Sequence, residues 1–307
     1  MRIQRYLTLA ALAALLGLGS VSGHFGVGGD TLVQAQGQAE CTVTVQPGES
    51  IQAAIDRAAE GDVICLAEGT WEENIKIEKS LVLRGKGLYE HPKVSPLPYG
   101  RTVIKGSKQG YPVAWIKIPE QAQTASIRIE GLTITRAKRG CADEVKVVCS
   151  FGVLIQGRTW VEIDHSIISE NAPYDIIGHG LVLKGSSRLQ ITNSAISRNG
   201  GYGIWTLNSS WAEISDCVIS QNGQVGILLE SSAKAIIERN EISGNWLYGV
   251  ALYQWPCYHT DEAFIGRVSG RANIIRSHPE YGSLAVCPPE LDFLMTEEGG
   301  CYGSSCE

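Results

Sequence analysis

The chain has 307 residues with 26 basic and 32 acidic side chains, and its formal net charge is −6. Removal of the leader predicted below would take away two arginines and one aspartate and leave the chain more acidic still. No basic stripe is present that could bind a row of phosphates, so the sequence disfavours nucleic acid as a partner.

Residues 1–35 are predicted to be a secretory signal peptide. Arg2 and Arg5 precede an apolar run over residues 7–18, and small residues follow, with a possible cleavage site at 33–35. The run is shorter than the ~20 apolar residues of a transmembrane helix, so a single-pass anchor is the less favoured alternative. We therefore expect a secreted protein, located outside the cell, in the periplasm or at the cell surface, with no membrane span after signal removal.

Residues 50–59 predict a short amphipathic helix. Ser50 is a suitable N-cap, and Gly61 lies just past the end. Apolar residues recur at helical spacing, namely Ile51, Ala54, Ile55 and Ala58. Such a helix would cover the open first coil of the repeat structure described next, because solenoids need caps.

Short alternating apolar segments then predict strands as far as residue 135. They lie at 63–66, 74–77, 81–85, 102–106, 113–118 and 127–135. Three longer loops interrupt the pattern, at 86–101, 136–150 and 172–180. Because long loops in compact domains are usually functional or mobile, we interpret the first as a possible overhang above a groove. The other two leave from one corner of adjacent coils and are expected to form a wall.

From residue 160 to residue 253 one pattern returns four times. The copies are VEIDHSIISEN (161–171), LQITNSAISRN (189–199), AEISDCVISQN (212–222) and AIIERNEISGN (235–245), each followed by a glycine and an apolar run. The last asparagines of the final three copies are spaced by 23 residues. A fixed period of this length predicts a repeat architecture.

Each repeat holds three apolar segments that alternate with the strand period of two and are too short for helices. The period leaves no room for a crossover helix. The simplest solution is a coil of three strands, each paired in parallel with its equivalents in neighbouring coils at ~4.8 Å. The sequence therefore predicts an all-β solenoid, a single-stranded parallel β-helix with an N-terminal capping helix.

Equivalent residues of such coils stack, so the repeats can be read as columns. Two isoleucine columns are predicted to point inward: Ile163, Ile191, Ile214 and Ile237, and Ile168, Ile196, Ile219 and Ile242. A polar inward column lies near one corner: Ser166, Ser194, Cys217 and Asn240. At the following corner of each coil, a ladder of asparagines is predicted whose side chains can hydrogen-bond the backbone amides of the turn. Its members are Asn171, Asn199, Asn222 and Asn245.

With these columns the chain resembles the right-handed parallel β-helix superfamily, the pectate-lyase-like fold. The segment PGESIQAAIDRAAEGDVICLAEGTWEENIKI (47–77) is similar to the opening coil of many secreted β-helix proteins. The resemblance covers roughly residues 41–287 and implies a right-handed coil, but one superfold carries many functions. We assign the β-helix domain to residues 36–290 and a C-terminal tail to 291–307, whose apolar start is expected to plug the last coil.

Nine cysteines in an exported chain are expected to form mainly disulfides. Their positions on strands, loops and corners predict four pairs: Cys41 with Cys65, Cys141 with Cys149, Cys257 with Cys287, and Cys301 with Cys306. Cys217 is left over. Because its column points inward, we predict a buried free thiol rather than a reactive or copper-binding one.

The outward columns of the first strand form the candidate site. They are Trp160, Arg188, Trp211 and Lys234, then Glu162, Gln190, Glu213 and Ile236, and finally Asp164, Thr192, Ser215 and Glu238. Aromatic faces beside charges suit an extracellular polysaccharide, because sugar rings stack on tryptophan and hydroxyl or uronate groups meet charge. The alternative is a solvated sheet with cross-strand ion pairs such as Arg188 with Glu162 or Glu213.

Substrate binding is assigned to Trp160, Trp211 and Glu162. The polysaccharide lyases and epimerases of the fold need a cation that neutralises a carboxylate and a base that takes the neighbouring proton. The candidates here are Arg188 and Lys234, with Glu213 nearby. Whether the polymer is cleaved stays open, because neither clustered calcium-binding acids nor paired glycosidase carboxylates are found in the sequence.

No cofactor or metal is expected. A copper-linked role, as in β-helix accessory proteins of nitrous-oxide reductase maturation, would need a cluster of His, Met or Cys, but the six histidines are scattered. His179 belongs to a column of residues before the third-strand glycines, with Phe151, Tyr202 and Tyr248, so we predict a stacking role rather than that of a general base. His165 is expected to lie in a turn.

An outward column of the third strand is apolar: Leu154, Val182, Trp205, Leu228 and Ala251. Exposed stripes of this kind mark an interface or are covered by a loop, and we favour a covering loop or a subunit contact over a ligand site. The rival to polysaccharide binding is therefore a noncatalytic structural or adhesion module, or a homo-oligomer, that binds protein through this Trp205 face.

Overall fold

The computed structural model describes residues 39–88, 100–141, 149–175, 178–276, 285–304 and 306. The predicted signal peptide and parts of the three long loops lie outside the described residues, and so do the overhang and the wall expected of those loops. In the described part of the chain, no helix is long and apolar enough to cross a membrane.

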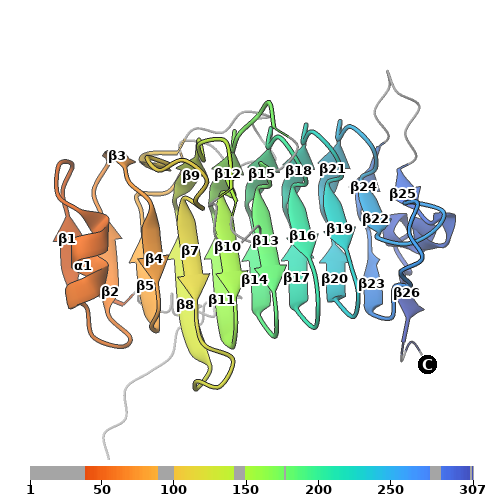
Figure 1. Cartoon of the computed structure of the whole chain (residues 1–307), viewed down its shortest axis with the longest axis horizontal. Coiled ribbons are helices and arrows are strands. Elements are labelled where there is room, and N and C mark those ends of the chain that lie inside the picture. Colours follow the sequence, from red (N-terminus) through yellow and green to blue (C-terminus); the bar gives the residue numbers. More distant parts are fainter. Residues whose placement is uncertain are drawn as a thin grey trace, which may run out of the picture. The chain divides into compact units, whose positions relative to one another are not determined.

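Three sheets wind around one core, and Figure 1 shows their coils stacked in chain order. Sheet A contains β1 (Val43–Val45), β2 (Val63–Leu66), β5 (Leu81–Arg84), β8 (Ala125–Glu130), β11 (Thr159–Asp164), β14 (Arg188–Thr192), β17 (Trp211–Ser215), β20 (Lys234–Glu238), β23 (Arg267–Arg271) and β26 (Gly300–Gly303). Sheet B contains β3 (Gly69–Glu72), β6 (Thr102–Lys105), β9 (Thr133–Thr135), β12 (Ile167–Ser169), β15 (Ala195–Ser197), β18 (Val218–Ser220), β21 (Glu241–Ser243) and β24 (Ile274–Ile275). Sheet C contains β4 (Ile75–Ile77), β7 (Ala114–Lys117), β10 (Val153–Gln156), β13 (Leu181–Lys184), β16 (Ile204–Thr206), β19 (Ile227–Leu229), β22 (Val250–Leu252) and β25 (Val286–Cys287).

From β2 to β25 each coil thus contributes one strand to each sheet, as the period of the sequence predicts, while β1 and β26 add one strand at each edge of sheet A. Neighbouring coils pair in parallel, for example β14 with β17 in sheet A, β15 with β18 in sheet B and β16 with β19 in sheet C. The pair of β23 with β26 is antiparallel and places the C-terminal strand at the edge of sheet A. The predicted all-β fold, a single-stranded parallel β-helix, is confirmed.

The inward isoleucine columns form the core. In sheet A, Ile214 pairs with Ile191 on one side and with Ile237 on the other. In sheet B, Ile219 pairs with the isoleucines of the coils before and after it. All eight predicted isoleucines are at most 1% exposed. Because each coil buries its apolar side chains against the next, the core continues along the whole stack.

The corner between sheets A and B turns through a residue in the left-handed region. This residue is His165, Asn193, Asp216 or Arg239 in successive coils, with φ angles of 45°, 48°, 56° and 55°. His165 therefore takes the predicted turn role. The following residues form the predicted polar inward column, in which Ser194 Oγ accepts the Ser166 N–H at 3.1 Å and Asn240 Oδ1 accepts the Cys217 N–H at 3.0 Å.

The predicted asparagine ladder occupies the corner between sheets B and C. Each side-chain oxygen accepts two N–H groups of the preceding asparagine: Asn222 Oδ1 accepts the backbone N–H of Asn199 at 3.1 Å and its Nδ2 at 3.0 Å. Asn222 Nδ2 in turn donates to the Ile196 carbonyl and to Asn245 Oδ1. The ladder supplies partners to backbone groups that the turn would otherwise leave buried and unpaired.

Both ends of the coil stack are covered. The predicted helix is α1 (Ile51–Arg57), whose N-cap Ser50 accepts the Ala53 N–H at 3.1 Å and whose Ile51 and Ile55 are buried. At the other end a 3₁₀ helix, η1 (Pro289–Met295), packs against β23, β25 and β26 and buries Leu291 and Leu294. The apolar start of the tail therefore closes the last coil.

All four predicted disulfides are present: Cys41–Cys65, Cys141–Cys149, Cys257–Cys287 and Cys301–Cys306. Cys217 is the free cysteine and is fully buried. Its thiol donates to the Ser215 carbonyl at 3.1 Å. The prediction of a structural rather than reactive thiol agrees with this burial.

We expect Asn222→Ala to lower the free energy of unfolding by at least about 2 kcal/mol, because two buried N–H groups of Asn199 lose their acceptor. Urea denaturation of the purified protein measures this. Ser220→Ala, on the outward face of the same coil, is the control and should change stability by less than about 0.5 kcal/mol. Equal effects of the two substitutions would contradict the role of the ladder.

Candidate functional site

The outward face of sheet A carries the predicted first-strand column. Trp160 pairs with Arg188, Arg188 with Trp211, and Trp211 with Lys234, on successive strands. The register extends the column by one further cation, Arg267 of β23. Two aromatic rings and three cations therefore lie in one row, which we call the tryptophan row, at a strand spacing of ~4.8 Å.

The two indole rings of this row contact each other. Their centroids are 5.7 Å apart and their planes are tilted by 34°, although Trp160 and Trp211 are two strands apart, a backbone separation of ~9.6 Å. Both side chains must lean toward the intervening strand to meet. Trp160 Nε1 also donates to Glu162 Oε1 at 3.2 Å, which orients the first ring. The result is a half-buried aromatic pair on a rigid sheet.

A shallow depression lies beside this pair. Its lining combines the indole of Trp211 with the side chains of Arg188 and Lys234 and with two corner serines, Ser209 and Ser232. The two hydroxyl groups are hydrogen-bond neighbours at 3.2 Å. The depression thus offers an aromatic wall, two exposed cations and hydroxyl groups within one short stretch of the face.

The cations of the row have no carboxylate partner among the described residues. The cross-strand pairs of Arg188 with Glu162 or Glu213, given above as examples for the solvated-sheet alternative, are absent from this part of the chain. Glu162 instead pairs with Arg128 Nη1 at 3.1 Å, one coil earlier. The side chain of Glu162 therefore turns away from Arg188 toward β8, and its pair with Arg128 is itself a cross-strand ion pair of the kind that the solvated-sheet alternative expects.

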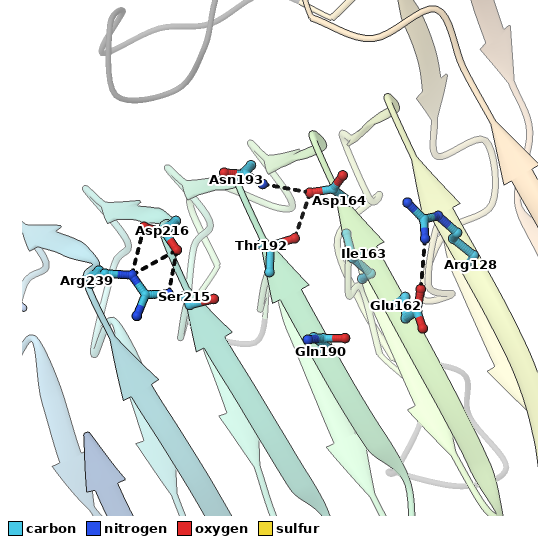
Figure 2. A pocket seen from close by; sticks show the side chains of 10 residues that line it. All are labelled: Arg128, Glu162, Ile163, Asp164, Gln190, Thr192, Asn193, Ser215, Asp216 and Arg239. Carbon is cyan, nitrogen blue, oxygen red and sulfur yellow. Dashed lines mark hydrogen bonds and ion pairs between the residues drawn. The ribbon is translucent and has the colours of Figure 1, made fainter. Parts of the chain in front are cut away.

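A second, polar hollow lies nearer the corner with sheet B (Figure 2). Gln190, Thr192 and Ser215 lie between two charged groups, with Arg128, Glu162 and Asp164 on one side and Asp216 and Arg239 on the other. Burial opposes ionisation of Asp164, but hydrogen bonds from Thr192, Asn193 and His165 outweigh it and lower the pKa of this carboxyl. Asp164 is therefore held as a carboxylate.

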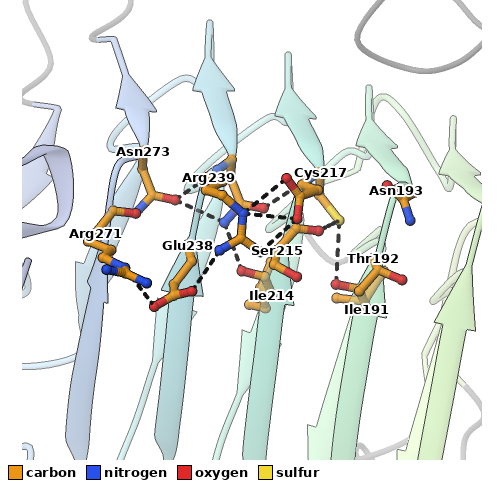
Figure 3. A network of polar contacts seen from close by, with 12 residues as sticks. Ile191, Thr192, Asn193, Ile214, Ser215, Cys217, Glu238, Arg239, Arg271 and Asn273 are labelled. Atoms are coloured by element: carbon orange, nitrogen blue, oxygen red, sulfur yellow. Dashed lines mark hydrogen bonds and ion pairs between the residues drawn. The ribbon is translucent and has the colours of Figure 1, made fainter. Parts of the chain in front are cut away.

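The far side of the hollow belongs to the structural network of the corner (Figure 3). Arg239 Nη2 pairs with Asp216 at 2.8 Å, and its Nη1 pairs with Glu238 at 2.8 Å. Glu238 also forms an ion pair with Arg271, with Nε 3.4 Å from Oε1. These groups are engaged with one another, so the groups in the best position to meet a ligand are those of the tryptophan row and of the adjacent Gln190 and Glu213.

The proposed catalytic residues share one face without forming a linked group. Arg188, Lys234 and Glu213 lie on neighbouring strands, but no hydrogen bond or ion pair joins them within the described ranges. Glu162 and Glu213 occupy the same row with Gln190 between them. Across the described residues no group of three or more His, Cys, Asp or Glu side chains could hold a metal ion.

The sequence reasoning missed two residues of the face, Arg128 and Arg267. Both lie on sheet A strands, where Arg128 pairs with Glu162 and Arg267 with Lys234. The coils that precede Trp160 and follow Lys234 are longer than 23 residues, so the repeat does not align them. The alternation in IRIE (127–130) was a usable signal for Arg128, since it places that side chain outward.

The apolar column of sheet C is not exposed. Leu154, Val182, Leu228 and Ala251 are fully buried, and Trp205 is half-buried. Residues of the Cys141–Cys149 excursion cover one part of the column, and Cys257 and Tyr258 cover the other. The favoured covering loops are therefore present, and the exposed apolar surface required by the protein-binding alternative is absent from the described residues.

His179 lies in the predicted stacking column. Its ring stacks on Tyr202 at 4.7 Å and on Phe151 at 5.4 Å, and its Nδ1 accepts the Tyr202 N–H at 2.8 Å. The column is corrected in one respect: Val225, not an aromatic residue, follows Tyr202, and Tyr248 comes one coil later. Burial, assisted by Lys184, lowers the pKa of His179 to about 3. A neutral, enclosed imidazole of this kind is a structural group.

Comparisons with known proteins agree with the fold. Residues 151–279 match the family described as "Right handed beta helix region". The match agrees with the fold observed here, a right-handed parallel β-helix. No curated protein sequence matches it.

Several solved structures are similar to this β-helix. An alginate lyase from Paenibacillus sp. str. FPU-7 is 17% identical, with 80% of this chain and 98% of that chain covered and a TM-score of 0.43. Rice weevil pectin methyl esterase is 12% identical, with 76% of each chain covered and a TM-score of 0.47. The pectate lyase Pel9A is 15% identical, with 78% and 63% covered and a TM-score of 0.46. At these identities and TM-scores the similarities carry no argument about function.

We expect acidification to destabilise the β-helix partly through His179. The unfolded chain takes up a proton as the pH falls below about 6.5, whereas the folded state does so only near pH 3, so stability is lost between these values at about 1.4 kcal/mol per pH unit. Urea denaturation between about pH 7 and pH 4 should show a flatter pH dependence for His179→Phe. An equal slope in both proteins would contradict this account.

Proposed function

We propose that the protein is exported and binds an extracellular polysaccharide along the outward face of sheet A. The tryptophan row is the observation that supports this most directly. Its two indole rings can stack on the apolar faces of sugar rings, and the exposed cations beside them can bind hydroxyl or carboxylate oxygens. Because the row lies on rigid, paired strands, little conformational entropy is lost when a ligand binds.

The same row favours an acidic polymer over a neutral one. Arg188, Lys234 and Arg267 have no carboxylate partner among the described residues, whereas Glu162 is compensated by Arg128. An anionic group of the ligand would pair with each of these cations and neutralise its charge. The carboxylate of Glu213 repels an anionic ligand, but the three cations of the row outnumber it. We therefore propose a polymer that carries uronate or similar anionic groups and runs across the strands of sheet A.

Export is proposed from two features. Residues 1–35 have the pattern of a signal peptide, and four disulfides connect eight of the nine cysteines. Disulfides persist in oxidising compartments and are rare in the cytosol. A polysaccharide ligand outside the cytosol is consistent with this location.

For modification of the polymer, the proposed groups remain Arg188, Lys234 and Glu213. A lyase or an epimerase must neutralise a uronate carboxylate and remove the neighbouring proton. Arg188 and Lys234 can supply the positive charge on either side of Trp211, and Glu213 lies on the same strand as Trp211, two residues on. Binding is the primary proposal, and turnover by these three groups is its extension.

We expect Trp160→Ala combined with Trp211→Ala to weaken retention on an acidic polysaccharide at least about tenfold, since loss of the two stacking surfaces removes at least about 1.4 kcal/mol. Affinity electrophoresis in gels that contain polygalacturonate, alginate or a neutral glucan measures retention. Trp255→Ala, which removes an exposed indole on another loop, is the control. Unchanged retention of the double variant would exclude the tryptophan row as the binding surface.

We expect Arg188→Gln combined with Lys234→Gln to reduce retention on acidic polymers and to leave any weak retention on a neutral glucan unchanged, because only charge is removed. The residual affinity should also depend less on salt. Formation of unsaturated or reducing ends is followed in the same samples. A wild-type protein that binds, releases no new ends and leaves the proton NMR spectrum of the uronate residues unchanged would reject the catalytic extension and leave the binding proposal intact.

A further inference from the structure

Sheet C carries a second polar cluster, separate from the tryptophan row. On one side of it, Cys141 and Cys149 pack in an apolar cluster with Leu154 of β10 and Val182 of β13. On the other side, Cys257 and Tyr258 pack in a cluster with Leu228 of β19 and Ala251 of β22. Trp205 of β16 packs against both apolar clusters, so it lies at the boundary between them. Each covering segment is held by a disulfide, Cys141–Cys149 or Cys257–Cys287.

The indole of Trp205 is held in one orientation. Its Nε1 donates to Glu230 Oε2 at 3.0 Å. The rings of His179 and Tyr202 lie edge to face with it, at centroid distances of 5.2 and 5.6 Å. Since the side chain is only half-buried, part of this fixed aromatic surface faces outward.

Two opposite charges share the neighbouring outward row, which lies two residues along the strands from the row of Trp205. Lys184 ends β13 and Glu230 directly follows β19, with Leu207 between them in the row, so two strand spacings or ~9.6 Å separate their backbones. Both side chains are half-buried. Burial raises the pKa of Glu230 and lowers the pKa of Lys184, and the attraction between the two groups opposes each shift. The nearby Glu262 also raises the pKa of Glu230, so the cluster has no excess of positive charge that would favour an anionic ligand.

We propose that Trp205, Glu230 and Lys184 form a second ligand site, which binds an uncharged pyranose unit of a glycan. The indole supplies a stacking surface for the apolar face of the sugar ring. The carboxylate accepts hydroxyl protons and the ammonium group donates to hydroxyl oxygens, so the pair addresses neighbouring hydroxyl groups without a net charge. This distinguishes the site from the tryptophan row, whose uncompensated cations favour an anionic ligand.

The proposal does not rest on the function of sheet A, and the test separates the two. The test uses the variant that carries both Trp160→Ala and Trp211→Ala, and isothermal titration calorimetry measures its binding of cellotriose, N,N′,N″-triacetylchitotriose and trigalacturonate. Intrinsic fluorescence reports whether one of the remaining tryptophans is near the ligand. We expect saturable binding of at least one neutral trisaccharide with a fluorescence change, and weaker binding or none for trigalacturonate.

Glu230→Gln and Lys184→Met, each added to this double variant, should lower the affinity for the neutral trisaccharide at least tenfold. Glu241→Gln on sheet B is the matched control and should leave binding unchanged. Thermal melting verifies that each variant is folded, and both substitutions avoid the core. The proposal is overturned if neither neutral trisaccharide binds, if only trigalacturonate binds, or if binding is insensitive to both Glu230→Gln and Lys184→Met.

Discussion

The parallel pairing of each coil with the next is the interaction on which the rest of this structure depends. It places chemically equivalent residues on top of one another at the strand spacing, so the requirements of one coil must be met by its neighbours. Apolar side chains satisfy this simply, as the isoleucine columns show. Polar backbone groups at the corners are more demanding, because they are buried on both sides. The asparagine ladder and the column that ends in Asn240 and Asn273 meet that demand by passing hydrogen bonds from coil to coil.

The same pairing organises the outer surface into rows. On sheet A it sets Trp160, Arg188, Trp211, Lys234 and Arg267 in line, each on the next strand. The backbone spacing alone would keep the two tryptophans apart, yet their rings meet across the intervening strand. A linear ligand that crosses the strands encounters aromatic surface and positive charge in alternation. The geometry suits an extended polymer better than a compact small molecule, because no deep enclosed cavity is needed for such contacts.

On sheet C the same pairing produces an outward column that is apolar rather than charged. This column would be an aggregation hazard if exposed, and two disulfide-held segments cover it instead. Where the segments meet, Trp205 stays partly open and two half-buried charges of opposite sign lie beside it. Coverage of the apolar column thus leaves an aromatic side chain and two polar groups together on this face. His179 lies beneath this region as a neutral stacking partner rather than as an acid or a base.

The sequence alone determined the three-strand coil, the inward columns, the asparagine ladder and the buried thiol of Cys217, because each follows from position within a fixed period. It also determined the four disulfides, through the placement of the cysteines on strands, loops and corners. It also determined which side chains of β11, β14, β17 and β20 point outward. The break of the aromatic column at Val225 can be read from the period itself, since Val225 precedes Gly226. The period fails where coils are longer, so Arg128 and Arg267 joined the face only through tertiary pairing. The partner of Glu162 and the burial of the Trp205 column were likewise decided by the tertiary structure. These depend on side-chain rotamers and on loops that fold back over distant strands, and neither is encoded in the spacing of residues along one coil.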